Sequence, residues 1–219
     1  KGKIAEHLKK LFQELDIDCV IDVGANEGQY RDFLRERVGF KGRILSFEPM
    51  PSLAKVLKKN AEADSSWEIF DCAVGSEEAT LPLKVSAKTG WSSLLDKLDT
   101  PRTEVADSVS VTEVVDVPVK PLDKVLSDLE GRIYLKIDAQ GFDLEVMKGA
   151  EQLLKRAAAM QTELEFLPVY QGSPDWPVVA SFLTERAYDI TGVFPIWTDK
   201  AMRIGEIDTV FRNMKVDSD

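Results

Sequence analysis

The chain has 219 residues, of which 44% are hydrophobic and 30% charged, and its net charge is -10 at pH 7. This length and apolar content suit a single α/β domain with a full hydrophobic core. A negative surface repels phosphate backbones and anionic lipids, so we expect neither nucleic acid nor a membrane as a partner. No apolar run reaches the roughly 18 residues that a membrane-spanning helix needs.

The chain begins with an amphipathic segment, which we assign to residues 1–18. Apolar residues recur at helical spacing in KGKIAEHLKKLFQEL, and this stretch lacks the continuous apolar core of a signal peptide. The only histidine, His7, lies here, where a solvated side chain is more typical than a catalytic one. We assign residues 19–213 to one main domain and residues 214–219 to a polar tail.

Two cysteines, Cys19 and Cys72, both lie in apolar runs. A disulfide framework or a zinc site needs more ligands than this pair supplies. We therefore expect two buried, reduced thiols, which fits a cytoplasmic protein.

Apolar, β-branched runs then alternate with helix-like stretches along the chain. This alternation is typical of βαβ units and a parallel sheet, whose connections are right-handed, so we expect a doubly wound three-layer sandwich. The predicted strands are residues 19–23, 43–47, 67–74, 133–138, 160–166 and 206–213, and the predicted helices are residues 30–38, 51–63, 143–156 and 177–186.

The middle of the chain has a different pattern. Residues 79–95 and 107–123 show period-2 alternation with proline and few helix formers. We expect extra strands there, before the fourth strand, flanking a long loop at residues 88–107. Loops of this length in a compact domain usually carry function.

The first strand ends in the turn VIDVGANEGQY, which contains Asp22, Gly24, Asn26 and Gly28. Glycine lets the backbone approach a ligand closely, and the helix that follows directs free N–H groups at an anionic group. The dinucleotide fingerprint G-x-G-x-x-G is not met, because Asn26 stands at its middle glycine. The turn alone leaves open a dinucleotide, a methyl donor or no ligand.

Glu48 ends the second strand in RILSFEP, about 20 residues past the turn. A carboxylate there has two oxygens and accepts hydrogen bonds from both hydroxyls of a ribose. Alone, Glu48 is an ordinary strand-end charge. Combined with the glycine turn, it indicates a ligand that contains ribose.

Four successive motifs, VIDVGANEGQY, RILSFEPMP, KPLDKVL and IYLKIDAQGFDLEVMKGA, resemble those of the FkbM family of S-adenosylmethionine-dependent methyltransferases. The resemblance covers residues 20–165. It implies a Rossmann-like class I methyltransferase fold with a seven-stranded, mostly parallel sheet whose last strand is antiparallel. It also implies O-methylation of a hydroxyl on a small molecule, often a sugar or a natural-product scaffold.

The resemblance also implies where the donor binds. The turn at Gly24–Gly28 suits the methionine end and Glu48 the ribose, and FDCAV, with Asp71, Cys72 and Ala73, lies where such folds place adenine. The stretch GWSSLL, which includes Ser93, resembles the family's loop, so we interpret it as a lid over the donor. The alternative is that Trp91 only anchors this loop to the core.

The acceptor hydroxyl must lose a proton, and a positioned carboxylate suits that task. Asp138, at the end of the fourth strand, is our first choice, and Glu163 on the fifth strand is our second. The commonest family motif has glutamates where this chain has Gln140 and Asp143, and Gln140 cannot act as a base. The acidic edge also suits Mg²⁺, although no ligand spacing demands a metal.

Tyr170 and Trp176 follow the fifth strand and are candidates for an acceptor pocket. Two other functions stay open at this point. One is a dinucleotide-dependent oxidoreductase, and the other is a non-catalytic protein that binds S-adenosylmethionine without turnover.

Overall fold

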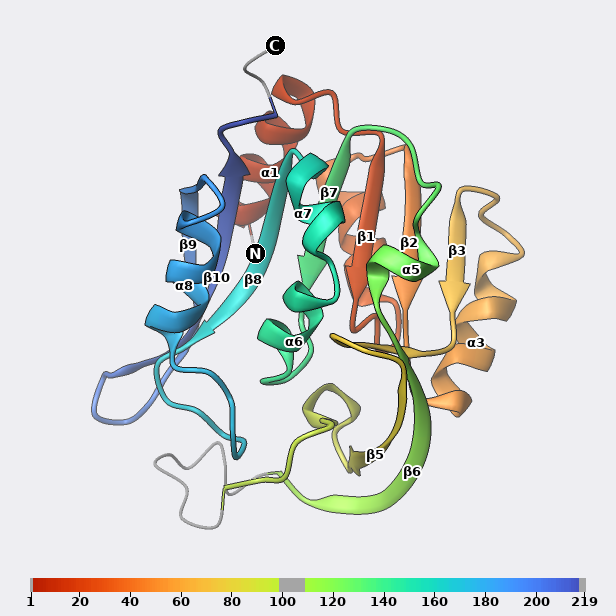
Figure 1. Ribbon diagram of the computed structural model, residues 1–219, viewed down its shortest axis with the longest axis vertical. Helices are drawn as coiled ribbons and strands as arrows, with labels where there is room; N and C mark the ends of the chain where they lie inside the picture. Colours follow the sequence, from red (N-terminus) through yellow and green to blue (C-terminus); the bar gives the residue numbers. More distant parts are fainter. Residues whose placement is uncertain (1, 99–108, 217–219) are drawn as a thin grey trace.

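The computed structural model describes residues 2–98 and 109–216. Within these residues, seven strands form one twisted sheet in the order β3-β2-β1-β7-β8-β10-β9 (Figure 1). The first five run parallel, β10 runs antiparallel to β8, and β9 runs antiparallel to β10. The strands are β1 (Cys19–Val23), β2 (Arg43–Phe47), β3 (Trp67–Phe70), β7 (Ile133–Ile137), β8 (Ala159–Glu165), β9 (Tyr188–Thr198) and β10 (Ile204–Asn213). The expected mostly parallel sheet is confirmed.

The central strands β1 and β7 are buried along their whole length. Parallel strands covered on both faces read as continuous apolar runs, which is why CVIDV and IYLKI were recognisable in the sequence. Each run contains one charged residue, Asp22 in β1 and Lys136 in β7, and the sheet register makes them direct neighbours. The two buried charges therefore lie side by side and compensate each other.

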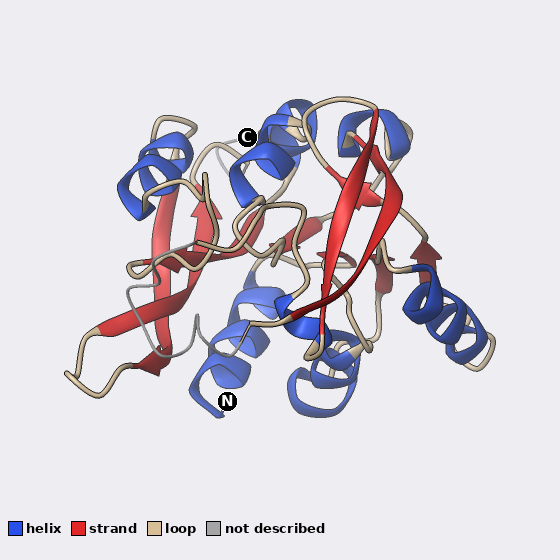
Figure 2. Cartoon of the chain, turned by 90° about the horizontal axis from the view of Figure 1, so that it is seen from below, coloured by secondary structure: helices blue, strands red, loops and turns tan. Residues whose placement is uncertain are grey.

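Helices cover both faces of the sheet and complete the three layers (Figure 2). Two apolar clusters separate the layers, one on each face of the sheet. The first face carries α1 (Gly2–Glu14), α2 (Gln29–Phe33), the π-helical turn η1 (Leu34–Val38) and α3 (Pro51–Ala61), and the second carries α5 (Leu122–Val125), α6 (Asp143–Lys148), α7 (Glu151–Arg156) and α8 (Trp176–Thr184). Helix α1 buries Leu8 and Phe12 in the same cluster as Val20 of β1, so it packs on the sheet as part of the fold.

The extra strands before the fourth strand form a second, three-stranded sheet in the order β4-β6-β5. Its strands are β4 (Ala73–Val74), β5 (Ala79–Ser86) and β6 (Val111–Lys120), followed after β5 by the short 3₁₀-helix η2 (Thr89–Trp91). This sheet lies beyond the carboxyl ends of the parallel strands, at the bottom of Figure 1. Residues 99–107 of the predicted loop and the end of the predicted tail lie outside the described residues.

Four elements differ from the sequence prediction. The helix predicted at 30–38 is α2 followed by the π-helical turn η1. The run 67–74 divides into β3 and β4, because its last two residues pair with β6 of the second sheet. The helix predicted at 143–156 breaks at Gly149, where a Cβ atom would lie 1.9 Å from the Gly75 carbonyl oxygen. Strand β9 was not predicted from its own sequence, since Gly192 and Pro195 interrupt the pattern of strand formers.

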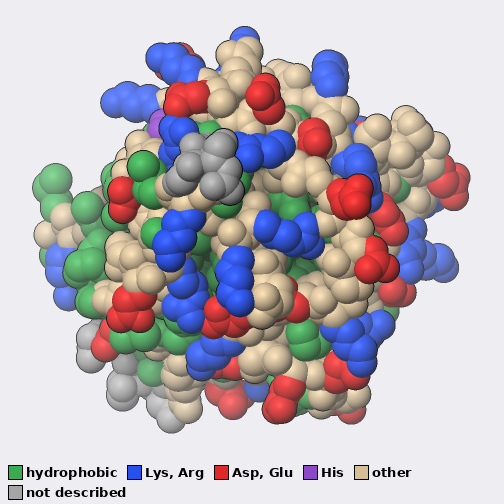
Figure 3. All heavy atoms as spheres, turned by 45° about the horizontal axis from the view of Figure 1, so that its top comes forward, with side chains coloured by type: hydrophobic (Ala, Val, Ile, Leu, Met, Phe, Trp, Pro, Cys, Tyr) green, Lys and Arg blue, Asp and Glu red, His purple; other side chains and the backbone are tan. Residues whose placement is uncertain are grey.

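The described surface carries charges of both signs. On the face that holds the amino ends of the parallel strands, lysine and arginine side chains are interspersed with acidic ones (Figure 3). Within residues 2–98 and 109–216, no helix is long and apolar enough to span a bilayer.

Candidate active site

A cavity of about 480 Å³ opens at the carboxyl ends of β1 and β7. The chain proceeds from β1 outward to β2 and β3, and from β7 outward in the other direction, so this is the point where the strand order reverses. Such points are where open α/β sheets bind ligands. The cavity walls include many of the residues predicted from the sequence, namely Gly24, Asn26, Glu48, Cys72, Ala73, Ser93, Asp138 and Glu163.

The turn after β1 has positive φ angles, a backbone conformation that favours glycine. Gly24 has φ +81°, and a Cβ atom there would lie 2.0 Å from the carbonyl oxygen of Asp138. Asn26 and Gly28 also have positive φ, 49° and 87°. The turn therefore packs directly against the end of β7, which brings the glycine motif and Asp138 to one wall of the cavity.

Glu48 is 5% exposed and is held by the same turn. Its Oε2 accepts a hydrogen bond from the Asn26 N–H at 2.7 Å, and its Oε1 accepts one from the Met50 N–H at 2.8 Å. Burial raises the pKa of Glu48 to about 7, although these two N–H groups act in the opposite direction. Both oxygens keep lone pairs for further donors.

Lys136 is the buried cation of the site. Its Nζ lies 3.2 Å from Asp22 Oδ1 and 3.4 Å from Asp138 Oδ2, and 5.1 Å from the centroid of the Tyr30 ring. Burial acts to lower the pKa of Lys136, but the surrounding carboxylates outweigh it and raise the pKa. The lysine stays charged and links the Asp22 carboxylate in β1 to the Asp138 carboxylate at the end of β7.

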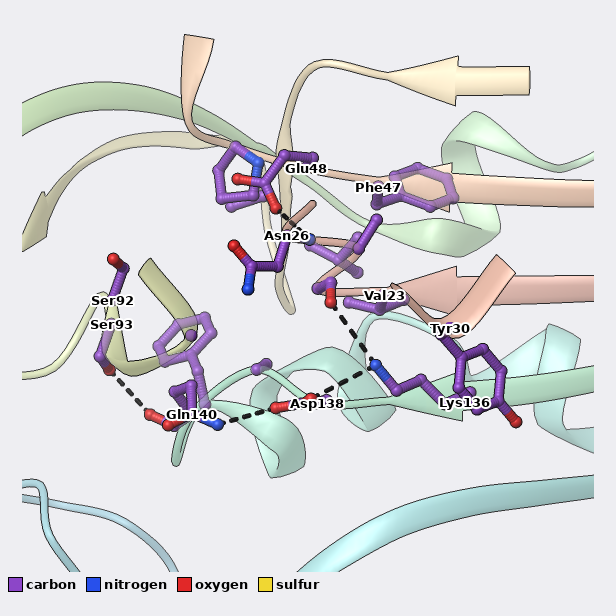
Figure 4. Close-up of a pocket in the computed structure, with 18 of the residues that line it drawn as sticks. Val23, Asn26, Tyr30, Phe47, Glu48, Ser92, Ser93, Lys136, Asp138 and Gln140 are labelled. Carbon is purple, nitrogen blue, oxygen red and sulfur yellow. Dashed lines mark hydrogen bonds and ion pairs between the residues drawn. The ribbon is translucent and has the colours of Figure 1, made fainter. Parts of the chain in front are cut away.

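Asp138 is held from its other side by Gln140, whose Nε2 donates to Asp138 Oδ1 at 2.8 Å (Figure 4). The Gln140 Oε1 accepts a hydrogen bond from the Tyr170 hydroxyl at 3.2 Å, and the Gln140 carbonyl accepts one from Ser93 Oγ at 2.7 Å. The segment around η2 is thereby fastened over the same edge of the cavity. Both oxygens of Asp138 have a fixed direction, and its side chain is 29% exposed.

Glu163 lines the cavity from β8. Burial raises its pKa well above the usual value, and the charges of Asp138, Glu206 and Asp208 act in the same direction. Burial and these neighbouring charges therefore favour the protonated form of the Glu163 carboxyl group. No group of three or more histidine, cysteine or acidic side chains among the described residues has an arrangement that could hold a metal ion.

Other sequence candidates lie outside the cavity wall. The Asp71 side chain is 66% exposed and pairs with Lys58 at 2.8 Å. Asp22 and Gly28 lie behind the wall, where Asp22 Oδ2 accepts a hydrogen bond from Ser46 Oγ at 3.2 Å. Both cysteines are free and buried, as expected, and Cys72 forms part of the wall.

Tyr170 and Trp176, the candidates for an acceptor pocket, do not line this cavity, although Tyr170 lines a small neighbouring pocket together with Gln140. The Tyr170 hydroxyl is turned toward the Trp91 carbonyl, to which it donates at 2.8 Å, and Trp176 packs on Phe166 with ring centroids 5.2 Å apart. His7 does not line the cavity, and its Nε2 contacts Thr191 Oγ1 at 3.1 Å.

Sequence reasoning missed several residues that line the cavity: Tyr30, Lys136, Gln161 and Asp208. Lys136 had a visible signal, since it is a lysine inside the otherwise apolar run IYLKI. Gln161 and Asp208 had none, because their direction depends on how β8 and β10 pair.

The chain matches the methyltransferase FkbM domain over residues 22–190. It is 28% identical over 199 residues to the methyltransferase sdnD of Sordaria araneosa, covering 78% of this chain and 74% of that protein. It is 23% identical over 223 residues to the 2-O-methyltransferase NoeI of Sinorhizobium fredii, covering 98% of this chain and 86% of that protein.

A crystal structure of methyltransferase FkbM from Methylobacillus flagellatus KT shares the fold, with a TM-score of 0.56 at 16% identity. The match covers 90% of this chain and 44% of that chain, so the present chain spans less than half of that protein.

Proposed function

The chain belongs to the FkbM methyltransferase family, and from this premise we propose that it is an S-adenosylmethionine-dependent O-methyltransferase acting on a hydroxyl of a small molecule, a sugar or a natural-product scaffold. The observation that carries the proposal is the glycine turn after β1, hydrogen-bonded to Glu48 and packed against Asp138 on one cavity wall. The methyltransferase family leaves no support for the oxidoreductase alternative.

The residues present fit this donor. Asn26 Oδ1 is buried without a hydrogen-bond partner among the described residues, so an acceptor atom is free at the turn. The Glu48 carboxylate has lone pairs for two ribose hydroxyls, and an apolar wall that includes Met50, Ala73 and Leu83 suits an adenine ring. When bound, this donor supplies an electrophilic methyl group on a sulfonium.

The chain's own residues then orient the acceptor and remove its proton. Asp138 is the proposed proton acceptor, because Lys136 and Gln140 fix both of its oxygens at the carboxyl ends of β1 and β7. Glu163 is the second candidate, since its buried, acidic surroundings raise its pKa and favour the form that already carries a proton. Positioning of the reacting oxygen and base is expected to supply most of the remaining acceleration.

Calorimetric titration tests the donor assignment. We expect S-adenosylhomocysteine and S-adenosylmethionine to bind and NAD(H) not to bind. Binding of NAD with no response to S-adenosylhomocysteine would overturn the proposal. Donor binding without homocysteine release on any acceptor in a broad panel of hydroxylated compounds would favour the non-catalytic alternative.

A further inference from the structure

Strands β8 and β10 carry four carboxyl side chains on one face. The antiparallel register places Glu163 opposite Asp208 and Glu165 opposite Glu206. Acidic side chains directly opposite each other on a sheet destabilise the strand pair, so this arrangement works against folding. Local conflicts of this kind are expected at functional sites. Of the four, Glu163 and Asp208 line the cavity.

A chain of buried hydrogen bonds fixes the Asp208 carboxylate. The hydroxyls of Tyr30 and Tyr134 both donate to Gln161 Oε1, at 2.9 and 3.1 Å. Gln161 is 3% exposed, and its Nε2 donates to Asp208 Oδ1 at 2.5 Å. Because the two tyrosines occupy the amide oxygen, the amide nitrogen must face Asp208. The carboxylate is therefore held in one orientation at the cavity wall.

The ionisable side chains of the cavity wall are mostly acidic. Among the described residues that line the cavity, Glu48, Asp138, Glu163 and Asp208 are acidic and Lys136 is the single basic one. Lys136 is already paired with Asp22 and Asp138. An anionic group entering beside Asp208 would thus meet carboxyl groups and no uncommitted cation in this wall.

Resting on the methyltransferase function proposed above, we propose that Asp208, held by Gln161, is an acceptor-binding residue that selects the substrate class. It accepts a hydrogen bond from a second hydroxyl of the acceptor while the reacting hydroxyl lies at Asp138. The acceptors it selects are polyhydroxylated and carry no negative charge next to the reacting hydroxyl. Neutral sugars have this chemistry, and uronic acids or phosphorylated sugars do not.

The test compares two probes with the same ring and different charge, methyl glucopyranoside and glucuronate. Saturation-transfer NMR on protein loaded with S-adenosylhomocysteine measures binding without turnover. We expect the neutral glycoside to bind at least about 10-fold more tightly than glucuronate, the difference that one charge-assisted hydrogen bond makes. Equal binding of the two probes, or binding of neither, overturns the proposal.

The variant Asp208→Asn keeps the shape and a carbonyl oxygen for Gln161, so the fold is preserved. It should weaken binding of the neutral glycoside about 10-fold and reduce the discrimination against glucuronate, with donor affinity unchanged. The matched control is Glu165→Gln, on the same face one cross-strand pair away and outside the cavity wall. An Asp208→Asn protein with wild-type discrimination also overturns the proposal.

Calorimetry with S-adenosylhomocysteine, done before the sugars are added, separates the two proposals. If the wild-type protein does not bind S-adenosylhomocysteine, the proposed function itself fails. Normal donor binding with no preference for the neutral probe is a failure of the role of Asp208 alone.

Discussion

Replacing Asp138 by asparagine is the sharpest test of the proposed chemistry. Asp138 accepts from Gln140 Nε2 at 2.8 Å, and its other oxygen faces Lys136 Nζ at 3.4 Å. Both neighbours are donors, so the new amide nitrogen must face one of them. One hydrogen bond is lost unless the Gln140 amide reverses. The Tyr170 hydroxyl permits that reversal, because its single proton can go to the Trp91 carbonyl at 2.8 Å while its oxygen accepts from Gln140.

The structural cost of this loss is modest. A lost hydrogen bond with a buried partner is worth about 1–2 kcal/mol, which corresponds to a decrease in melting temperature of about 2–8 °C for a chain of this size. Lys136 keeps its ion pair with Asp22 at 3.2 Å, so its charge is not left unpaired. The folded protein should therefore persist and bind S-adenosylhomocysteine normally.

The catalytic cost is larger. If Asp138 accepts the proton of the acceptor, kcat should decrease about 100-fold or more in the Asp138→Asn protein. The assay is homocysteine release with an acceptor found in a screen of hydroxylated metabolites. Glu163→Gln is the comparison, and it should retain more activity because burial and neighbouring carboxylates favour the protonated form of Glu163. Normal turnover by Asp138→Asn, with an inactive Glu163→Gln, would refute the reasoning.

Three further outcomes are expected. Glu48→Gln should weaken S-adenosylhomocysteine binding about 10-fold or more, because the amide nitrogen of the new glutamine must face the N–H of Asn26 or Met50. The control is Asp71→Asn, at an exposed ion pair. If both variants bind with the same affinity, Glu48 is a simple strand-end charge. Gly24→Ala should lower the melting temperature more than Gly39→Ala. Both glycines have φ near +80°, but of the two only Gly24 has a backbone atom within 4 Å of a new Cβ. Equal decreases would show that the backbone conformation, and not this close contact, sets the cost. The ligand-free protein should lose stability as pH rises from about 4.5 to 7, because the folded state keeps protons that the unfolded state releases in this range. The pKa of Glu48 moves from 4.5 to about 7 on folding, which accounts for about 3 kcal/mol of this loss. A melting temperature that rises over this range would contradict the burial of Glu48.

Much of the fold was predictable because the central strands are buried on both faces. Runs such as Cys19–Val23 contain little besides apolar residues, and they stand out from the helices around them. The edge strand β9 carries Gly192 and Pro195 and exposes most of its residues, so its sequence has no comparable pattern. An edge strand forms because it pairs with its neighbour in the folded protein, and the local sequence pattern does not reveal that pairing.

The cavity wall was predictable in part, for a related reason. A residue at a strand end has a known position along the chain but an unknown direction. Asp71, Cys72 and Ala73 are consecutive, yet Cys72 and Ala73 face the cavity while Asp71 pairs with Lys58 at the surface. Asp208 lies on a predicted strand, but its place at the wall follows from the antiparallel pairing with β8. Sequence alone does not specify that register.

The second sheet has a consequence for how the two halves of the cavity communicate. Its apolar cluster contains Met50 and Ala73, from the wall proposed to hold the donor, and Leu83 from β5. The backbone of β5 pairs with Ser93, which in turn is hydrogen-bonded to Gln140 beside Asp138. A continuous series of packed and hydrogen-bonded residues thus joins the proposed adenine side to the proposed acceptor side. Any cooperativity carried along it must be reciprocal, so that a donor that tightens acceptor binding by some factor is itself bound more tightly by the acceptor, and by the same factor.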